Sequence, residues 1–399
     1  MNDYRNDFPQ LARTVYGKPL VYLDNAATSL RPLSVISCWD RISSESTANL
    51  HRAVHRVAVE ATDAYEAARD AVKDFIGAPA REEIIFTSGA THSLNLAAWS
   101  LGEAFIKEGD EIIVSEAEHH SNIVPWQMLC SRKGAKLRVL PVSDSGSLRL
   151  DLLPGLLSER TRIVSVCHAS NVLGLVNPVQ EIAAMVHAAG ALLVVDGAQG
   201  IVHQSVDVQA LGCDFYAFSG HKMYGAPGTG VLWGRRELLE QMPPMFGGGE
   251  MIGTVRWSGT TYAPLPQKFE AGTQNISGTP CFVPAIGQTR KMQQDEEIKE
   301  FIYTELQRIP GLRLFGTADD LEQKLPVFSF AVEGAHHEDL ALIMDKMGVA
   351  LRSGQMCAEP LMDRFGVTGM LRASFAPYNT MQEAEYFLSS LRKAITMLK

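Results

Sequence analysis

Short apolar runs end directly in polar residues at two places, LLVVDGAQ (192–199) and FYAFSGHK (215–222). Each run is β-branched or aromatic and apolar throughout, which is typical of a strand covered on both faces of a sheet. Similar runs occupy residues 83–86, 111–114, 137–140, 163–166 and 230–233. Helical patterns fill several of the gaps between them. The sequence therefore predicts an α/β fold in which helices wrap a mainly parallel, seven-stranded sheet.

The pattern breaks between about residues 243 and 280, where prolines and glycines indicate connecting loops. Beyond this stretch we expect a helix, a strand, a helix and a last helix, at about residues 295–308, 327–331, 338–347 and 380–398. Thr380 and Glu383 have the spacing of a capping box at the start of the last helix. The chain is expected to divide into a large domain, residues 15–275, and a smaller α+β domain, residues 1–14 and 276–399.

Composition bounds the class of protein. The 399 residues allow two or three domains, and 36 Lys and Arg against 45 Asp and Glu give a formal charge of −9. That acidic balance argues against nucleic acid or an anionic membrane surface as the main partner. No apolar run approaches the roughly 18 residues of a membrane span, and the N-terminus lacks a secretory pattern. Six cysteines without a C-x-x-C pair exclude a disulfide scaffold, so we expect a cytoplasmic protein.

Polar residues follow five of the predicted strands. In open α/β sheets ligands bind beyond the carboxyl ends of the strands, so these residues are expected to share one site. They are TSGAT (87–91), EAEHH (116–120), Ser170 with Asn171, DGAQ (196–199) and SGHK (219–222). The first is a turn of small residues that opens a helix, whose free N–H groups suit a phosphate. His51 and His55 stand four residues apart and could share a helical face, but they lack further ligands and no metal site is expected.

This set of side chains has the chemistry that pyridoxal phosphate requires. Its aldehyde needs a lysine, here Lys222, and its ring nitrogen needs a carboxylate, here Asp196. Taken singly, each residue has a commoner role: Asp196 in a turn, Lys222 in solvent, His119 as a structural histidine. Taken together they favour the cofactor, because five strand ends would otherwise each need an unrelated polar residue.

Longer motifs extend this interpretation. YLDNAAT (22–28), EHHSNIVPW (118–126), VDGAQG (195–200) and FSGHKMYG (218–225) resemble the class V aminotransferase group, with its fold-type I architecture. LRSGQMCA (351–358) and LRASFAPYN (371–379) are similar to the group II cysteine desulfurases of the SufS/CsdA type. The resemblance covers nearly the whole chain.

The resemblance implies a role for each matching residue. Lys222 would form the Schiff base and move the Cα proton, Asp196 would pair with the ring nitrogen, and His119 would stack on the ring. Gln199 would bind the phenolate oxygen. The phosphate would be held by Ala90, Thr91, Ser219 and His221, with Thr273 supplied by the other subunit of a homodimer. Asn171 and Arg372 would bind the substrate carboxylate, for which the planar fork of arginine is suited.

Cys357 decides the reaction class. A transaminase needs no thiol, whereas a desulfurase needs a thiolate that attacks the substrate sulfur. Free cysteines are commonly small buried hydrophobes, as Cys167 in its apolar strand is expected to be. Cys357 instead lies in a polar, glycine-containing loop. The resemblance implies conversion of L-cysteine to L-alanine with a persulfide on Cys357, which would supply iron–sulfur cluster assembly.

Three features depart from the family pattern. Relatives often have histidine where this chain has Met356, which removes a proton carrier next to the cysteine. The segment from Ile286 to Asp295 is several residues shorter than in many relatives. Relatives that pass sulfur to a zinc scaffold of the SufU type have histidine where this chain has Glu338. This difference favours a SufE-like acceptor.

Three other functions remain open from the sequence. A selenocysteine lyase would use the same site, because a selenol is the better nucleophile and leaving group. Another class V aminotransferase or epimerase would have Cys357 only by chance. A cofactor-free binding scaffold is disfavoured because both Lys222 and Asp196 are present.

Overall fold

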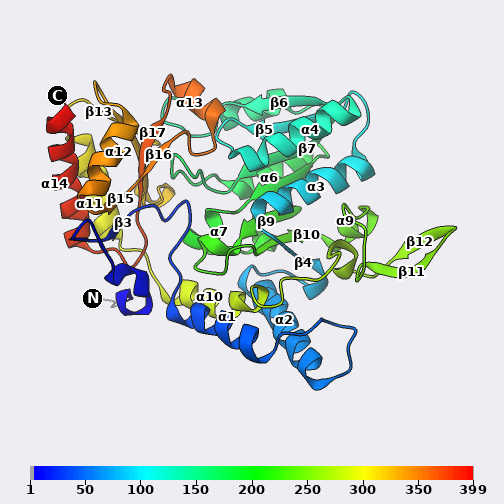
Figure 1. The fold of residues 1–399 in the computed structure, drawn as a ribbon. Coiled ribbons are helices and arrows are strands. Elements are labelled where there is room, and N and C mark those ends of the chain that lie inside the picture. The colour runs from blue at the N-terminus through cyan, green and yellow to red at the C-terminus, as the bar shows by residue number, and fades with distance from the viewer. Residues whose placement is uncertain (1–3, 399) are drawn as a thin grey trace.

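The computed structural model describes residues 4–398, and Figure 1 shows one large sheet with helices on both sides and a second, smaller α+β unit beside it. The large sheet has the strand order β4-β10-β9-β8-β7-β5-β6. Its strands are β4 (Ile84–Thr87), β5 (Glu111–Ser115), β6 (Lys136–Leu140), β7 (Thr161–Cys167), β8 (Leu192–Asp196), β9 (Phe215–Ser219) and β10 (Gly230–Gly234). β10 runs antiparallel to β4 and β9, and the other neighbouring strands pair in parallel. The predicted mainly parallel, seven-stranded sheet is confirmed.

Alternate residues of each strand enter opposite cores. Leu193 and Val195 of β8 belong to one buried cluster, whereas Val194 belongs to the other. This alternation follows from the two-residue period of a strand, and it explains why the runs are apolar throughout. The helices of this unit are α1 (Leu33–Glu45), α2 (Arg56–Phe75), α3 (Ala90–Phe105), α4 (Val124–Lys133), α5 (Leu153–Leu156), α6 (Val179–Ala188), α7 (Gly200–His203), α8 (Val208–Leu211), α9 (Arg236–Gln241) and α10 (Phe282–Lys291).

The smaller unit is a four-stranded antiparallel sheet in the order β13-β14-β17-β16, covered by helices. Its elements are α11 (Glu296–Gln307), β13 (Leu312–Phe315), β14 (Val327–Val332), α12 (His337–Lys346), β15 (Val349–Ala350), β16 (Arg352–Gly354), α13 (Glu359–Phe365), β17 (Met370–Ser374) and α14 (Met381–Leu398). The predicted capping box is confirmed. The Thr380 hydroxyl accepts from the Glu383 N–H at 3.2 Å, and the Glu383 carboxylate accepts from the Thr380 N–H at 3.2 Å.

Two segments pack across the predicted domain boundaries. Strand β3 (Val21–Tyr22) pairs in parallel with β15, and Val21 lies in the core of the smaller unit. Phe282 and Ile286 of α10 lie in a core cluster of the large sheet, and Figure 1 shows α10 beside α1. Both contacts join residues that the predicted boundaries assign to different domains. The boundaries at residues 14 and 275 stay predictions.

Two local predictions were wrong. The stretch predicted as loops contains a hairpin, β11 (Ile252–Arg256) and β12 (Gly259–Tyr262), which projects from the body of the molecule (Figure 1). A second small hairpin, β1 (Thr14–Val15) and β2 (Lys18–Pro19), lies near the N-terminus. His51 and His55 do not share a helical face, because α2 begins only at Arg56 and His55 is its N-cap.

Among residues 4–398, no helix is long and apolar enough to cross a membrane.

Candidate active site

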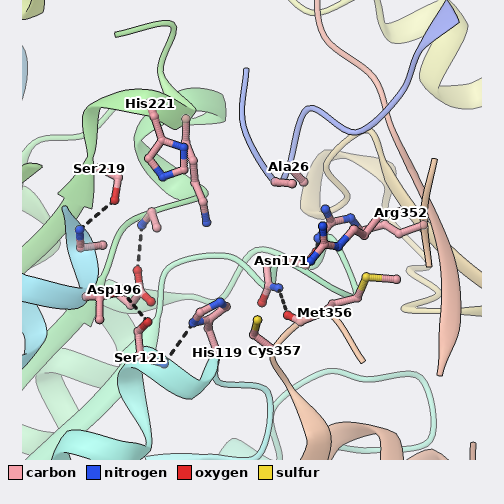
Figure 2. Close-up of a pocket in the computed structure, with 16 residues that line it drawn as sticks. Ala26, His119, Ser121, Asn171, Asp196, Ser219, His221, Arg352, Met356 and Cys357 are labelled. Carbon is pink, nitrogen blue, oxygen red and sulfur yellow. Dashed lines mark hydrogen bonds between the residues drawn. The ribbon is translucent and has the colours of Figure 1, made fainter. Parts of the chain in front are cut away.

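A cavity of about 320 Å³ opens where the carboxyl ends of the large sheet face the smaller unit. Ten of the predicted site residues line it: Ala90, Thr91, His119, Asn171, Asp196, Ser219, His221, Lys222, Cys357 and Arg372. Figure 2 shows several of them, drawn from both units, around one space. The structure thus brings together residues that lie up to 282 positions apart in the chain (372 − 90).

Asp196, which is buried, and Lys222, which is half-buried, are groups of opposite charge in this cavity. Asp196 ends β8, and its Oδ1 accepts from the Ala198 N–H at 2.9 Å. Burial raises the pKa of Asp196, and the charge of Lys222 opposes this. Burial likewise lowers the pKa of Lys222, and Asp196 opposes that. A lysine whose neutral amine is favoured by burial is suited to nucleophilic attack on a carbonyl.

His119 presents a neutral imidazole to the cavity. Its Nδ1 accepts from the Ser121 N–H at 3.0 Å, so the ring hydrogen lies on Nε2. Burial, with help from the charge of Lys222, lowers the pKa of His119 to about 4. A neutral ring held at its edge in this way can stack on a flat aromatic ligand.

The turn between β4 and α3 forms a polar seat. Gly89 has a φ of 148°, which an L side chain rarely adopts, and α3 begins at the next residue. The Ala90 N–H donates to Ser219 Oγ at 2.7 Å, and the Thr91 and Ser121 hydroxyls lie 2.7 Å apart. Hydroxyls and a helix N-terminus together suit a phosphate group.

Arg372 has an unpaired donor. The side chain is buried in β17, where Nη1 donates to the Asn171 carbonyl at 2.9 Å and Nη2 donates to Asp24 Oδ1 at 3.0 Å. Nε is buried without a hydrogen-bond partner. Burial lowers the pKa of Arg372, and Asp24 opposes this. Each Nη carries a second N–H, so this guanidinium, which lines the cavity, is suited to a carboxylate.

The Cys357 loop is held to the large unit by three hydrogen bonds. The His120 N–H donates to the Cys357 carbonyl at 2.7 Å, Asn171 Nδ2 donates to the Met356 carbonyl at 2.9 Å, and the Glu359 N–H donates to His120 Nε2 at 3.0 Å. These bonds support two consecutive residues with positive φ, 53° at Met356 and 56° at Cys357. Of the six cysteines, Cys357 alone is exposed.

A turn of the large unit also binds the smaller unit next to the cavity. Three successive carbonyls of residues 171–173 each accept from a side chain of the smaller unit. The donors are Arg372 Nη1 to Asn171 at 2.9 Å, Ser329 Oγ to Val172 at 2.6 Å, and Lys324 Nζ to Leu173. We call residues 171–173 with these three donors the interdomain clasp. It fixes Asn171 and Arg372 relative to one another.

The comparisons with known proteins agree with this geometry. The model of the family described as "Aminotransferase class-V" matches residues 21–387. The chain belongs to the class V aminotransferase family. A Xylella fastidiosa member named "Probable cysteine desulfurase" is 46% identical over 99% of this chain and 95% of its own. A Cronobacter sakazakii "Cysteine desulfurase" is 44% identical over 98% and 97%.

Solved structures give the same result. The Escherichia coli cysteine desulfurase CsdA is 39% identical, with a TM-score of 0.90 over 99% of this chain and 98% of that one. A cysteine desulfurase from Thermococcus onnurineus NA1 is 36% identical, with a TM-score of 0.91 over 98% of each chain. The resemblance seen in the sequence is confirmed by these matches.

Two residues assigned from the family pattern do not line the cavity. Gln199 is buried, and its Nε2 donates to the Ala26 carbonyl at 2.7 Å, so it borders the site through Ala26. Thr273 instead lines a second cavity of about 700 Å³, which Thr91 also borders. That position is compatible with a role toward a second subunit, which stays a prediction.

Sequence reasoning missed one cationic residue of the cavity. Arg352 lines it from β16, directly across the strand pair from Arg372. The motif LRSGQMCA contains this arginine, but a single residue at a strand edge gives no sign of the cross-strand pairing. Met356, where the resemblance implied histidine, packs its side chain in an apolar cluster with Val172 and Leu361.

Proposed function

We propose that this chain is a pyridoxal-phosphate-dependent cysteine desulfurase that converts L-cysteine to L-alanine and keeps the sulfur as a persulfide on Cys357. The observation that carries the proposal is the exposed Cys357, held by hydrogen bonds over a cavity that Lys222 and Arg372 also line. The names of the relatives support the same activity.

The residues of the cavity fit pyridoxal phosphate. The N-terminus of α3, with Ser219, Thr91 and His221, would hold the phosphate. Asp196 would hold the proton of the ring nitrogen, and Lys222 would bind the aldehyde carbon. Bound there, the cofactor supplies a sink for the electrons released at the substrate Cα. The neutral His119 would cover the ring face.

Protein side chains would perform the remaining steps. Arg372 and Asn171 bind the substrate carboxylate and so direct the substrate sulfur toward Cys357. Lys222 takes the Cα proton. The Cys357 thiolate attacks the substrate sulfur, so that a sulfur–sulfur bond forms as the carbon–sulfur bond breaks. The remaining three-carbon product gains protons and leaves as alanine.

Gln199 and Thr273 have supporting places in this proposal. The Gln199 amide would bind the phenolate oxygen of the cofactor from behind Ala26. Thr273 would reach the phosphate bound by the other subunit of a homodimer. The proposed setting is the cytoplasm, with a SufE-like thiol acceptor that passes the sulfur to iron–sulfur cluster assembly.

Alanine release tests the proposed reaction. Cys357→Ala should abolish alanine formation from L-cysteine in the presence of a thiol acceptor, whereas Cys38→Ala, at the other cysteine with some exposure, should retain it. Unchanged turnover in Cys357→Ala would contradict the proposal. Negligible turnover of L-cysteine by the wild type, with rapid turnover of L-selenocysteine, would instead establish a lyase.

A further inference from the structure

Two cysteines lie together outside the active-site cavity, where α1 packs against the short helix η8 (Thr279–Cys281). The Cys281 sulfur is fully buried and lies 3.3 Å from the Ser277 carbonyl oxygen and 3.8 Å from the Val35 carbonyl oxygen of α1. Val35 and Cys38 are three residues apart in α1 and so share one helix face. Cys38 packs against the same small cluster as Cys281.

Cys38 is the accessible member of this pair. It is partly exposed and lines a surface cavity of about 480 Å³, together with Arg41 of the next helical turn. The hydrogen bond with the Cys281 thiol is the largest influence on Cys38 and lowers its pKa to about 7. Burial opposes this, and the Arg41 guanidinium adds to it. A lowered pKa increases the fraction of Cys38 that is thiolate at neutral pH, and the thiolate is the form that reacts with oxidants.

The pKa of Cys281 shifts in the opposite direction to that of Cys38. The hydrogen bond with Cys38 and burial both raise the pKa of Cys281. Burial also raises the pKa of Cys130, Cys167 and Cys213. An accessible thiolate beside a protonated thiol is the arrangement in which oxidation of the first sulfur is resolved by the second.

We propose that Cys38 and Cys281 form a peroxide-oxidisable thiol pair that closes to a disulfide between α1 and η8. The Cys38 thiolate attacks hydrogen peroxide, which leaves sulfenic acid on Cys38 and releases hydroxide. The Cys281 sulfur then attacks the sulfenic sulfur, a sulfur–sulfur bond forms, and water leaves. In total two thiols lose two hydrogens and one peroxide is reduced to two waters.

This inference does not depend on the proposed desulfurase activity. Cys357 lines the active-site cavity, whereas Cys38 and Cys281 do not. Failure of the thiol pair would leave the desulfurase proposal intact, and the reverse also holds.

Peptide mapping without reductant tests the pair. The full-length protein is treated with hydrogen peroxide at neutral pH, its free thiols are blocked, and it is digested with trypsin. Cys38 and Cys281 are the only cysteines of the tryptic peptides 14–41 and 269–290. We expect these peptides to be joined after oxidation and separated again by reductant. Cys213→Ser, which removes a buried cysteine outside the pair, should leave the cross-link unchanged.

Two variants separate the roles of the sulfurs. In Cys281→Ser, Cys38 should accumulate as sulfenic acid that a dione reagent traps. In Cys38→Ser, Cys281 should stay reduced. The proposal is overturned if the wild type gives no cross-link, whether Cys38 stays reduced or proceeds to the sulfinic acid. It is also overturned if Cys281 is oxidised at the same rate without Cys38.

Discussion

Arg372 is a buried residue that binds other groups of the protein and also lines the active-site cavity. Its two Nη atoms each donate one hydrogen bond within the protein, to Asn171 and Asp24, and each keeps a second N–H for a ligand. Its position is thus fixed without a ligand, which would reduce the entropy lost when the proposed substrate carboxylate binds.

Replacement of this arginine by lysine should weaken substrate binding. Lysine cannot reproduce the planar fork, so Arg372→Lys should raise the KM for L-cysteine by about 10- to 100-fold, the equivalent of roughly 1.5–3 kcal/mol. Steady-state alanine formation measures this effect. Arg364→Lys, in an arginine that contacts the Val142 carbonyl instead, serves as the control. Equal KM values for the two variants would rule out carboxylate binding by Arg372.

Glu118 is a buried carboxyl behind the site. It accepts from Ser115, from Asn122 Nδ2 at 2.6 Å and from the Cys167 N–H at 2.8 Å. Burial raises the pKa of Glu118 to about 7, although these hydrogen bonds oppose the rise.

This raised pKa predicts a pH-dependent stability. Between about pH 4.3 and 7 the folded state retains a proton that the unfolded state has lost. The free energy of unfolding should therefore fall as pH rises, by up to about 1.4 kcal/mol per pH unit relative to Glu118→Gln, and the difference should be constant above pH 7. Urea unfolding of both proteins across this range measures it. Parallel stability curves would show that Glu118 does not titrate in this way.

At the scale of elements, the interdomain clasp links the proposed substrate-binding residues, Asn171 and Arg372, to the packing of two units. β14 supplies Ser329, β17 supplies Arg372, and the turn after β7 supplies the three carbonyls. The same turn supplies Asn171, which holds the Cys357 loop. Loss of one clasp donor should therefore disturb groups that it does not contact.

Ser329→Ala tests this coupling. We expect the KM for L-cysteine to rise several-fold while kcat falls less, because Asn171 and Arg372 shift and the cofactor residues do not. Ser390→Ala, at a serine of α14 that is also buried, controls for a general loss of stability. A lower melting temperature of Ser329→Ala with an unchanged KM would show that the clasp stabilises the fold but does not affect substrate binding.

The sequence predicted the elements whose pattern follows from burial on both faces. The seven strands of the large sheet are apolar throughout because helices cover each side, so they were recognisable without the fold. The β11–β12 hairpin was missed because its residues are almost all exposed and its sequence, with Trp257 at the tip, has no buried face to pattern. Arg352 was missed because its place depends on strand pairing with Arg372, which single-sequence periodicity does not specify.

At the scale of the whole molecule, Thr273 makes the proposed homodimer testable. Thr273 lines the second cavity and not the active-site cavity of its own chain. If it completes the partner's phosphate site, Thr273→Ala should weaken cofactor retention by about 10-fold or more, the loss expected for a hydrogen bond to a charged group. Thr289→Ala, at a threonine of α10 outside both cavities, is the control.

Hybrid dimers sharpen this prediction. A mixture of Thr273→Ala and Lys222→Ala chains should recover cofactor affinity and activity in the sites that combine an intact Lys222 with an intact Thr273 from the other chain. No recovery in mixed dimers, verified by light scattering, would place Thr273 outside the partner's site.

The central claim is that Cys357 receives the substrate sulfur, and the mass of the intact protein tests it most directly. The wild type is incubated briefly with L-cysteine and pyridoxal phosphate, without reductant, alongside Cys357→Ala and Cys38→Ala. We predict a gain of one sulfur atom in the wild type and in Cys38→Ala, reversed by a thiol, and no gain in Cys357→Ala. A cofactor-loaded wild type that gains no sulfur, or a Cys357→Ala variant that gains it equally, would contradict the account.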